Sequence, residues 1–259
     1  MLHGRDEPDE PGRSLKTYSA MFHPQGPTFW ELMTQALSST ERGYDLIAPK
    51  FDYTPFRTPD GVLQIVMDHV AQQGQVAAGL DVCCGTGAAL RWLRPVCQER
   101  AVGVDVSAGM LHVARERLAD APGSAKLELV RGDALRMPFA DGEFDLAVCF
   151  GAFGHIDARD QPQFVSEVGR VLRPGGRFVF ICWHRPPLWS LQYWWRRVFN
   201  GVMRVRNWLL APPFIMYYLT FLLPGARAVL ETHGFTVAEA GVQFPEPWSD
   251  FQLVVATRK

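Results

Sequence analysis

The sequence predicts an α/β fold built around a mostly parallel β-sheet. Between Ala77 and Trp183, short apolar runs alternate with amphipathic segments, which is the βαβ pattern of such a sheet. A glycine-rich turn follows the first apolar run, and an acidic residue ends the second. The chain has 259 residues, a length that suits one α/β domain with additions.

Composition limits the classes of function. The hydrophobic fraction of 47% and charged fraction of 20% are ordinary for a protein with a sizeable core. The net charge of −1 gives no global reason to expect a nucleic-acid partner. The 5 cysteines show neither a CxxC pair nor a zinc-type spacing with histidine, so we expect reduced thiols and no metal site.

The chain divides into zones of different character. Residues 1–14 are acidic and rich in proline and glycine, without the apolar run of a signal peptide, and we expect a disordered tail in a cytoplasmic protein. Residues 15–75 have helical character with scattered aromatics. Residues 76–259 hold the alternating pattern, interrupted at 184–223 by an aromatic-rich insertion.

The first strand of the sheet is expected at 79–83, followed by a turn at 84–87 and a helix from Ala88. Glycine is needed in this turn because the chain must reverse sharply and bring backbone N–H groups near a ligand. A dinucleotide-binding turn has a third small residue where this chain has Leu90, and Asp81 would repel a pyrophosphate. Both features disfavour a nicotinamide-dependent oxidoreductase.

Acidic residues follow the next two strands. The second strand, 101–104, ends in Asp105, where a carboxylate can accept hydrogen bonds from both ribose hydroxyls of an adenosine. Ser107 then caps a helix whose apolar face includes Met110. The third strand, 127–130, leads to Asp133, whose carboxylate can meet an adenine amine.

The remaining strands complete the pattern. A strand is expected at 144–150, a helix at 160–172 and, after a break at 173–176, a fifth strand at 177–183. Two further strand-like runs, at 235–242 and 251–257, close the chain.

Five segments in order resemble the class I S-adenosylmethionine methyltransferase family, and more closely its branch of ubiquinone/menaquinone-biosynthesis and other small-molecule enzymes. The resemblance covers residues 40–183 well and the last strands loosely. It implies a Rossmann-like seven-stranded sheet with a final antiparallel strand and an N-terminal helical lid; to this the chain adds an aromatic-rich insertion after strand 5, which we expect to be helical. The matching segments are 80–87, 103–107, 132–134, 144–147 and 172–176.

The resemblance also implies the cofactor, S-adenosyl-L-methionine, and where it binds. Glycine-turn roles fall on Gly85 and Gly87, the ribose acid on Asp105 and the adenine acid on Asp133. One position departs from the family: Cys83 stands where glycine or alanine is usual. The full set of expected cofactor-binding residues is Tyr44, Tyr53, Asp81, Cys83, Gly85, Gly87, Asp105, Val106, Met110, Asp133, Ala134, Phe150 and Gly151.

The tyrosines in this set come from a segment at 44–53 that resembles the family's lid helix. Tyr44 and Tyr53 would lie over the cofactor, where an aromatic face attracts a sulfonium cation. Ordinary packing of a helix edge explains the same residues equally well.

The cofactor's chemistry decides what a catalytic residue must do. Its methyl group already carries a good leaving group, so the protein mainly has to place the acceptor in line. A base is needed only if the acceptor must lose a proton. His155 and His184 follow the fourth and fifth strands and are the candidates, although a structural or pocket-lining role is the favoured interpretation of each.

The insertion at 184–223 is rich in aromatics and arginine, and no Asp or Glu occurs from His184 to Leu230. Its most apolar run, 208–223, is broken by Pro212-Pro213 and is too short for a confident membrane span. Three interpretations remain open: a cap of mostly helices lining an apolar acceptor pocket, a surface lying on an anionic membrane, or a homodimer interface. The first two are compatible.

The sequence therefore predicts methyl transfer to a hydrophobic small-molecule or lipid-like acceptor. The expected location is the cytoplasm, with peripheral contact at the inner membrane surface through 184–223 as an option. The alternatives are a non-catalytic ligand-binding member of the same fold and, disfavoured by Leu90 and Asp81, an oxidoreductase.

Overall fold

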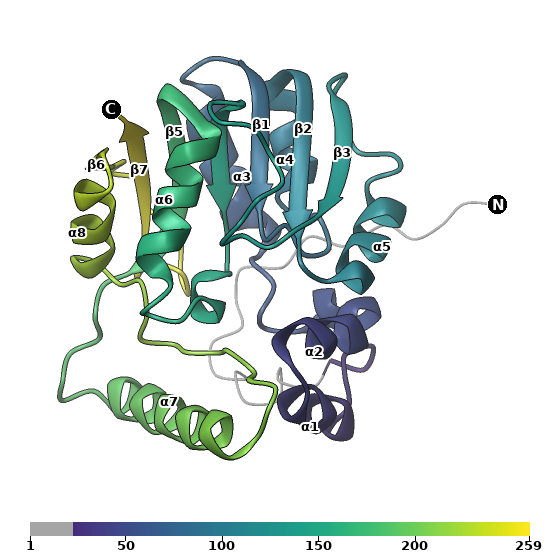
Figure 1. Cartoon of the computed structure of the whole chain (residues 1–259), viewed down its shortest axis with the longest axis vertical. Helices are drawn as coiled ribbons and strands as arrows, with labels where there is room; N and C mark the ends of the chain where they lie inside the picture. The colour runs from purple at the N-terminus through teal and green to yellow at the C-terminus, as the bar shows by residue number, and fades with distance from the viewer. Residues whose placement is uncertain (1–22) are drawn as a thin grey trace.

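A computed structural model describes residues 23–259; the tail expected at 1–14 lies outside this range. Its centre is a seven-stranded sheet with the order β3-β2-β1-β4-β5-β7-β6 (Figure 1). All neighbouring strands are parallel except that β7 runs antiparallel to both β5 and β6, as the sequence predicts. The strands are β1 (Val76–Val82), β2 (Cys97–Asp105), β3 (Lys126–Arg131), β4 (Phe144–Cys149), β5 (Leu172–Trp183), β6 (Phe235–Glu239) and β7 (Phe251–Arg258).

Helices cover both faces of the sheet. On one face lie α3 (Asp60–Ala71), α4 (Leu90–Leu93) and α5 (Ala108–Arg117), and on the other α6 (Gln161–Val171) and α8 (Gly225–Thr232). Successive residues of the central strands face opposite layers: Ala147 packs with α6 and Leu146 and Val148 with α3 and α4. Burial on both faces explains why these strands read as unbroken apolar runs.

Three elements differ from the sequence expectation. The helix after the glycine turn begins at Leu90 instead of Ala88 and lasts one turn, because Pro95 cannot continue it and the chain tightens into a 3-10 turn, η2 (Arg94–Val96). β5 already pairs with β4 at Leu172, and the Arg173–Gly176 segment bulges out before pairing resumes at Arg177. The insertion forms one helix, α7 (Leu191–Leu209), and residues 210–224 are irregular.

The carboxyl ends of the parallel strands are covered by segments from both ends of the chain. α1 (Phe29–Leu37), α2 (Thr40–Ile47) and the 3-10 helix η1 (Ala48–Tyr53) form what we call the N-terminal lid, residues 29–53. The lid and α7 lie together at this end of the molecule (Figure 1). α3, in contrast, packs into the sheet core through Val62, Val66 and Val70. The site must therefore be sought between the strand ends and these covering segments.

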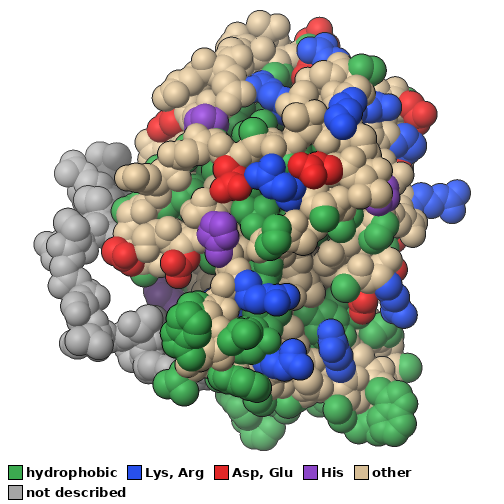
Figure 2. Space-filling view, turned by 90° about the vertical axis from the view of Figure 1, so that its left-hand side faces the viewer, with side chains coloured by type: hydrophobic (Ala, Val, Ile, Leu, Met, Phe, Trp, Pro, Cys, Tyr) green, Lys and Arg blue, Asp and Glu red, His purple; other side chains and the backbone are tan. Residues whose placement is uncertain are grey.

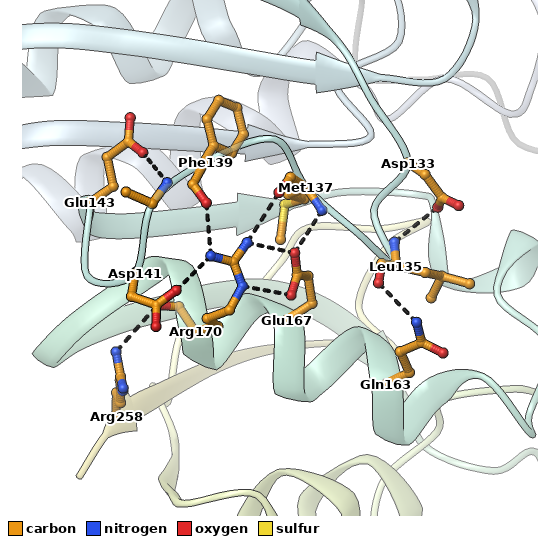
Figure 3. Close-up of polar contacts among 11 residues, drawn as sticks. Asp133, Leu135, Met137, Phe139, Asp141, Glu143, Gln163, Glu167, Arg170 and Arg258 are labelled. Atoms are coloured by element: carbon orange, nitrogen blue, oxygen red, sulfur yellow. Dashed lines mark hydrogen bonds and ion pairs between the residues drawn. The ribbon is translucent and has the colours of Figure 1, made fainter.

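The connection between β3 and β4, residues 132–143, contains no helix and is held in place by side chains of α6 (Figure 3). The guanidinium of Arg170 donates to the carbonyls of Met137 and Phe139 and to the carboxylates of Asp141 and Glu167. Glu167 in turn accepts a hydrogen bond from the Met137 N–H at 2.6 Å. Because this connection includes Asp133, the Arg170 network stabilises the segment that carries one of the acids expected at the site.

Candidate functional site

A cavity of about 500 Å³ opens at the carboxyl ends of β1, β2 and β4, a size typical of small-molecule sites. Side chains from the strand ends form its floor, and residues of the lid and of the insertion form its other walls. Eleven of the residues expected to bind a cofactor are in or beside this region. Those that line the cavity are Tyr44, Asp81, Cys83, Gly85, Asp105, Val106, Met110, Asp133, Ala134, Phe150 and Gly151.

The glycine turn after β1 uses backbone conformations that favour glycine. Gly85 and Gly87 have φ of +53° and +83°, and a Cβ on Gly87 would lie 2.6 Å from Leu118 Cδ1. Cys83 also has a positive φ, +58°, which costs a residue with a side chain about 1 kcal/mol. Position 83, where the family usually has glycine or alanine, therefore has a left-handed backbone conformation. Cysteine is strained in this conformation.

Leu90 has a physical role where a dinucleotide-binding turn would carry a small residue. Its side chain is fully buried beneath the turn. A Cβ on Gly103 of β2 would overlap Leu90 Cδ1 and would also lie 2.8 Å from Cys84 Sγ. The close approach of helix and sheet is thus made possible by a glycine on the neighbouring strand.

Asp105 joins the ends of two adjacent strands. Its Oδ2 accepts a hydrogen bond from Gly85 N–H at 2.9 Å and its Oδ1 one from Ser107 N–H, also at 2.9 Å. Burial raises the pKa of Asp105, and these two backbone donors act in the opposite direction. A carboxylate has further lone pairs, so Asp105 can still accept hydrogen bonds from hydroxyl groups in the cavity.

Asp81 is a buried acid without a partner. Its side chain is only 2% exposed, and Oδ2 has no hydrogen-bond partner within residues 23–259. Burial, with a smaller contribution from nearby Asp105, raises the pKa of Asp81 well above its usual value. Because Asp81 lines the cavity, a cationic donor bound there would relieve this cost.

Asp133 follows β3, which lies two strands away from β1 in the sheet. Like Asp81 at the end of β1, it lines the cavity. Its Oδ1 accepts a hydrogen bond from Leu135 N–H at 2.9 Å, a local turn that fixes the side chain. Apolar walls beside it come from Val106, Met110 and Ala134. An acid next to flat apolar walls suits a planar heterocycle with an amino group.

The lid is attached to the strand ends by two acids that sequence reasoning did not single out. Asp45 accepts hydrogen bonds from Ser107 Oγ at 2.6 Å and Gly109 N–H at 2.8 Å. Asp52 accepts one from Thr86 Oγ1 at 2.5 Å and forms ion pairs with Arg57 and Arg117. Both acids lie in the lid segment that the family resemblance includes, but their partners, Ser107, Gly109 and Thr86, lie more than 30 positions away, and no local pattern indicates them.

The two lid tyrosines have different positions. Tyr44 lines the cavity and packs against the rings of Phe51, Phe214 and His155. Tyr53 stacks on His23 with ring centroids 4.9 Å apart and lies outside the cavity. Only Tyr44 is therefore carried into the proposed site.

His155, in the 3-10 turn η3 (Phe153–His155) after β4, forms a pair with Tyr44. Its Nδ1 lies 2.7 Å from the Ile215 carbonyl oxygen, and its Nε2 lies 2.7 Å from Tyr44 Oη. A carbonyl can only accept, so Nδ1 carries the proton and Nε2 accepts the tyrosine O–H. Burial lowers the pKa of His155 and raises the pKa of Tyr44. Both groups are therefore neutral near pH 7.

A second cavity of about 230 Å³ adjoins the first and has aromatic walls. The two cavities share Phe56, Arg57, Thr58, Gly151 and His155. Residues 216–218, 220 and 221 of the insertion line part of the second cavity. The aromatic lining residues are Phe153, Trp183, Tyr217, Tyr218, Phe221, Trp248 and Phe251.

His184, the other histidine considered as a base, is exposed and lines neither cavity. It forms a backbone bridge with Leu223 at the base of the insertion, which explains its place in the fold. The proposed site therefore omits His184 along with Tyr53. Within residues 23–259 there is also no cluster of three or more His, Cys, Asp or Glu that could hold a metal ion.

Comparisons with known proteins agree with this geometry. Residues 80–176 match the methyltransferase domain family. A demethylmenaquinone methyltransferase of Lactiplantibacillus plantarum is 31% identical over 154 residues, which cover 58% of this chain and 62% of that protein. A 2-phytyl-1,4-naphtoquinone methyltransferase of Nostoc punctiforme is 35% identical over 142 residues, or 54% and 60% of the two chains. The chain thus spans about three fifths of the length of these relatives.

Solved structures share the fold. Magnesium protoporphyrin IX methyltransferase of Synechocystis, a structure with bound SAH, has a TM-score of 0.57 and 15% identity, with 77% of this chain and 83% of that chain covered. A SAM-dependent methyltransferase of Methanosarcina mazei has a TM-score of 0.55 and 19% identity, with 74% and 96% covered. These similarities confirm the Rossmann-like class I methyltransferase fold expected from the sequence.

The unpartnered Asp81 makes a prediction about the ligand-free protein. The pKa of Asp81 is raised in the folded protein, so ionisation of Asp81 opposes folding. The free energy of unfolding therefore falls as pH rises above the ordinary pKa of an aspartate. Asp81→Asn should therefore raise the free energy of unfolding at pH 7 by about 1–2 kcal/mol. The gain over the unchanged protein should shrink as pH is lowered towards 4, as measured by urea unfolding.

Asp145→Asn is the matched control. Asp145 is also buried but accepts a hydrogen bond from Ala78 N–H at 2.7 Å and pairs with Arg173, so its replacement should destabilise the protein. If Asp81→Asn and Asp145→Asn destabilise equally, Asp81 has a partner in solution and this interpretation of the site is wrong.

Proposed function

We propose that this chain, which carries a methyltransferase domain of the class I fold, binds S-adenosyl-L-methionine and transfers its methyl group to a hydrophobic, quinone-like acceptor. The observation that carries the proposal is the pair of adjoining cavities that meet at His155. One has polar groups suited to an adenosine and an amino acid, and the other has aromatic walls suited to an apolar acceptor.

The residues of the larger cavity fit the cofactor's groups in turn. The carboxylate of Asp105 would accept hydrogen bonds from the ribose hydroxyls, and Asp133 with its apolar neighbours would hold the adenine. The methionine part carries an ammonium group, and Asp81 is the buried carboxylate that lacks a partner for it. The family's glycine turn, at Gly85 and Gly87, lets the backbone approach this part of the ligand.

The bound cofactor would supply an electrophilic methyl group on a sulfonium. Tyr44 and Phe150, both in the larger cavity, offer aromatic surface to a cation there. The N-terminal lid, attached through Asp45 and Asp52, excludes water from the same end of the sheet. The protein's contribution is then mainly placement and exclusion of water.

The smaller cavity supports an apolar, ring-shaped acceptor. Its walls include the edge of Trp183 and the rings of Tyr217, Tyr218 and Phe251. The relatives named above methylate demethylmenaquinone and 2-phytyl-1,4-naphthoquinone by their names, and this supports an acceptor with a quinone-like ring.

His155 is placed to take a proton from the acceptor. It lines both cavities, it is neutral, and its Nδ1–H is fixed by the Ile215 carbonyl, which leaves the lone pair on Nε2. In the ligand-free protein Nε2 accepts the Tyr44 O–H, so Tyr44 holds the ring in this orientation. An acceptor O–H or ring C–H that loses its proton during methyl transfer would have to take the place of the Tyr44 O–H at this nitrogen.

A lipid-like acceptor would be met at a membrane surface, and we propose peripheral membrane contact through the insertion at 184–223. No helix within residues 23–259 is long and apolar enough to cross a membrane. The exposed apolar and basic side chains of the insertion would make this contact.

Asp105 provides the test of the cofactor. Asp105→Ala should weaken binding of S-adenosylmethionine, or of its demethylated product, by roughly tenfold or more, because a charge-assisted contact to the ribose is lost. Isothermal titration calorimetry measures the affinity. Asp68→Ala, an exposed acid on α3, serves as control and should bind as the unchanged protein does. Equal affinity of the Asp105 variant would remove Asp105 from the site.

His155 provides the test of the base. His155→Gln should lower turnover of a prenylated naphthoquinone acceptor by about a hundredfold while cofactor affinity stays within a few-fold. Because burial lowers the pKa of His155, the unchanged enzyme should stay active down to pH values below the ordinary histidine range and lose activity only under acid conditions. A variant whose turnover and pH profile match those of the unchanged enzyme would show that His155 takes no proton.

A further inference from the structure

Helix α7 turns its apolar side away from the protein. Leu191, Trp195, Val198, Val202 and Val205 recur at helical spacing, and each is between 56% and 89% exposed. The inward side is mixed: Asn200 is buried and its side chain accepts a hydrogen bond from the Tyr218 N–H, while Met203 is buried against Phe214 and Tyr217. A surface helix of a protein that contacts only water has the opposite arrangement.

Helix α1 has the same inverted arrangement. Its exposed apolar residues are Phe29, Trp30, Met33 and Leu37, between 40% and 76% exposed, while Gln35 is its buried residue. Two neighbouring helices thus both expose large apolar side chains to solvent, and this repetition indicates a functional surface. A patch of this size on a protein needs something to cover it.

Arg206 joins the two helices into one face. Its guanidinium, on α7, donates to the carbonyls of Ala36 and Ser38 at the end of α1, and also to that of Pro212. Figure 2 shows hydrophobic side chains gathered at this end of the molecule, with basic groups among them. We call this surface the docking face; it consists of Phe29, Trp30, Met33, Leu37, Trp189, Leu191, Trp194, Trp195, Val198, Val202, Val205, Trp208 and Leu209.

The charged side chains that the insertion contributes beside the docking face are all basic. Arg185, Arg197 and Arg204 are exposed, and no Asp or Glu occurs from His184 to Leu230. The acid of α1, Glu31, is already paired with Lys50 at 2.7 Å. Exposed arginines next to exposed tryptophans match the boundary between lipid headgroups and acyl chains on an anionic bilayer.

We propose that the docking face binds the surface of an anionic lipid bilayer, with α1 and α7 lying in the plane of the interface. A second copy of the chain would be a poorer occupant, because a two-fold contact through α7 would bring the arginines of both copies together without acids to neutralise them. Trp30, Trp189 and Trp208, each more than 75% exposed, would anchor the face among the headgroups.

The docking face also lies next to the larger cavity. The entry route that this position allows for the acceptor rests on the proposed function. Ser39 and Thr40, just after α1, and Pro212 and Pro213, just after α7, line that cavity. The two segments touch, since Thr40 N–H donates to the Pro213 carbonyl. A lipid-like acceptor would therefore enter between them directly from the bilayer, without crossing water.

Vesicle co-sedimentation tests the proposal with the full chain. Vesicles of phosphatidylcholine with about a third phosphatidylglycerol should bind the unchanged protein, and vesicles of phosphatidylcholine alone should bind it at least about tenfold more weakly. Trp189→Ser with Trp208→Ser, and separately Arg197→Glu with Arg204→Glu, should each reduce binding to the anionic vesicles by about tenfold. Arg91→Glu, an exposed arginine on α4, is the matched charge control and should bind normally.

Two measurements on the same variants separate the outcomes. Each variant should bind S-adenosylmethionine as the unchanged protein does, so a failure of the cofactor proposal appears in calorimetry and not in vesicle binding. Absence of binding to anionic vesicles at low salt, or binding that neither variant pair reduces, would overturn the proposal. A dimer seen by analytical ultracentrifugation and lost on replacing Trp189 and Trp208, together with no vesicle binding, would assign the docking face to a second copy instead.

Discussion

The site depends on one carboxylate that ties together the ends of two neighbouring strands. Asp105 ends β2 and accepts hydrogen bonds from Gly85, in the turn after β1, and from Ser107, at the start of α5. The Ser107 hydroxyl continues the connection, since it donates to Asp45 of the lid and accepts from Met110 N–H. The turn, the helix and the lid are thus held by one continuous set of hydrogen bonds. The same carboxylate faces the cavity, so the group that holds the turn is also the group available to a ligand.

Two residues at the end of β1 have conformations or surroundings that destabilise the ligand-free protein. Cys83 adopts a left-handed conformation, and the Asp81 carboxylate is buried without a partner beside Asp105. Each of these features costs stability in the ligand-free protein. Both lie at the wall of the cavity, which is where such costs are expected when a bound ligand offsets them. The proposed ligand would offset the cost at Asp81, because its ammonium group would pair with the carboxylate. Within residues 23–259, no hydrogen bond offsets the backbone strain at Cys83.

The sequence was sufficient to predict the strands and the acids at their ends, because apolar runs and the residues that follow them are local signals. The positions of Asp81, Asp105 and Asp133 at strand ends follow from such signals, and the seven strands with an antiparallel last strand follow from the family resemblance. Contacts between distant segments could not be predicted. Tyr44 reaches His155 across 111 positions, and Arg206 reaches Ala36 across 170, and nothing local to either residue indicates its partner. The sequence also could not predict that the apolar side of α7 faces solvent. Its pattern indicates an amphipathic helix but not which side of the helix faces the protein.

The central claim is the identity of the nucleotide, and thermal unfolding with competing ligands tests it most directly. S-adenosylmethionine and S-adenosylhomocysteine, added at about a hundred times their dissociation constants, should each raise Tm by about 5 °C or more. NADH and NADPH at the same concentrations should leave Tm unchanged, because Leu90 fills the place of the small residue that a dinucleotide turn needs and Asp81 repels a pyrophosphate. A Tm raised by NADH or NADPH and not by S-adenosylmethionine would contradict the account.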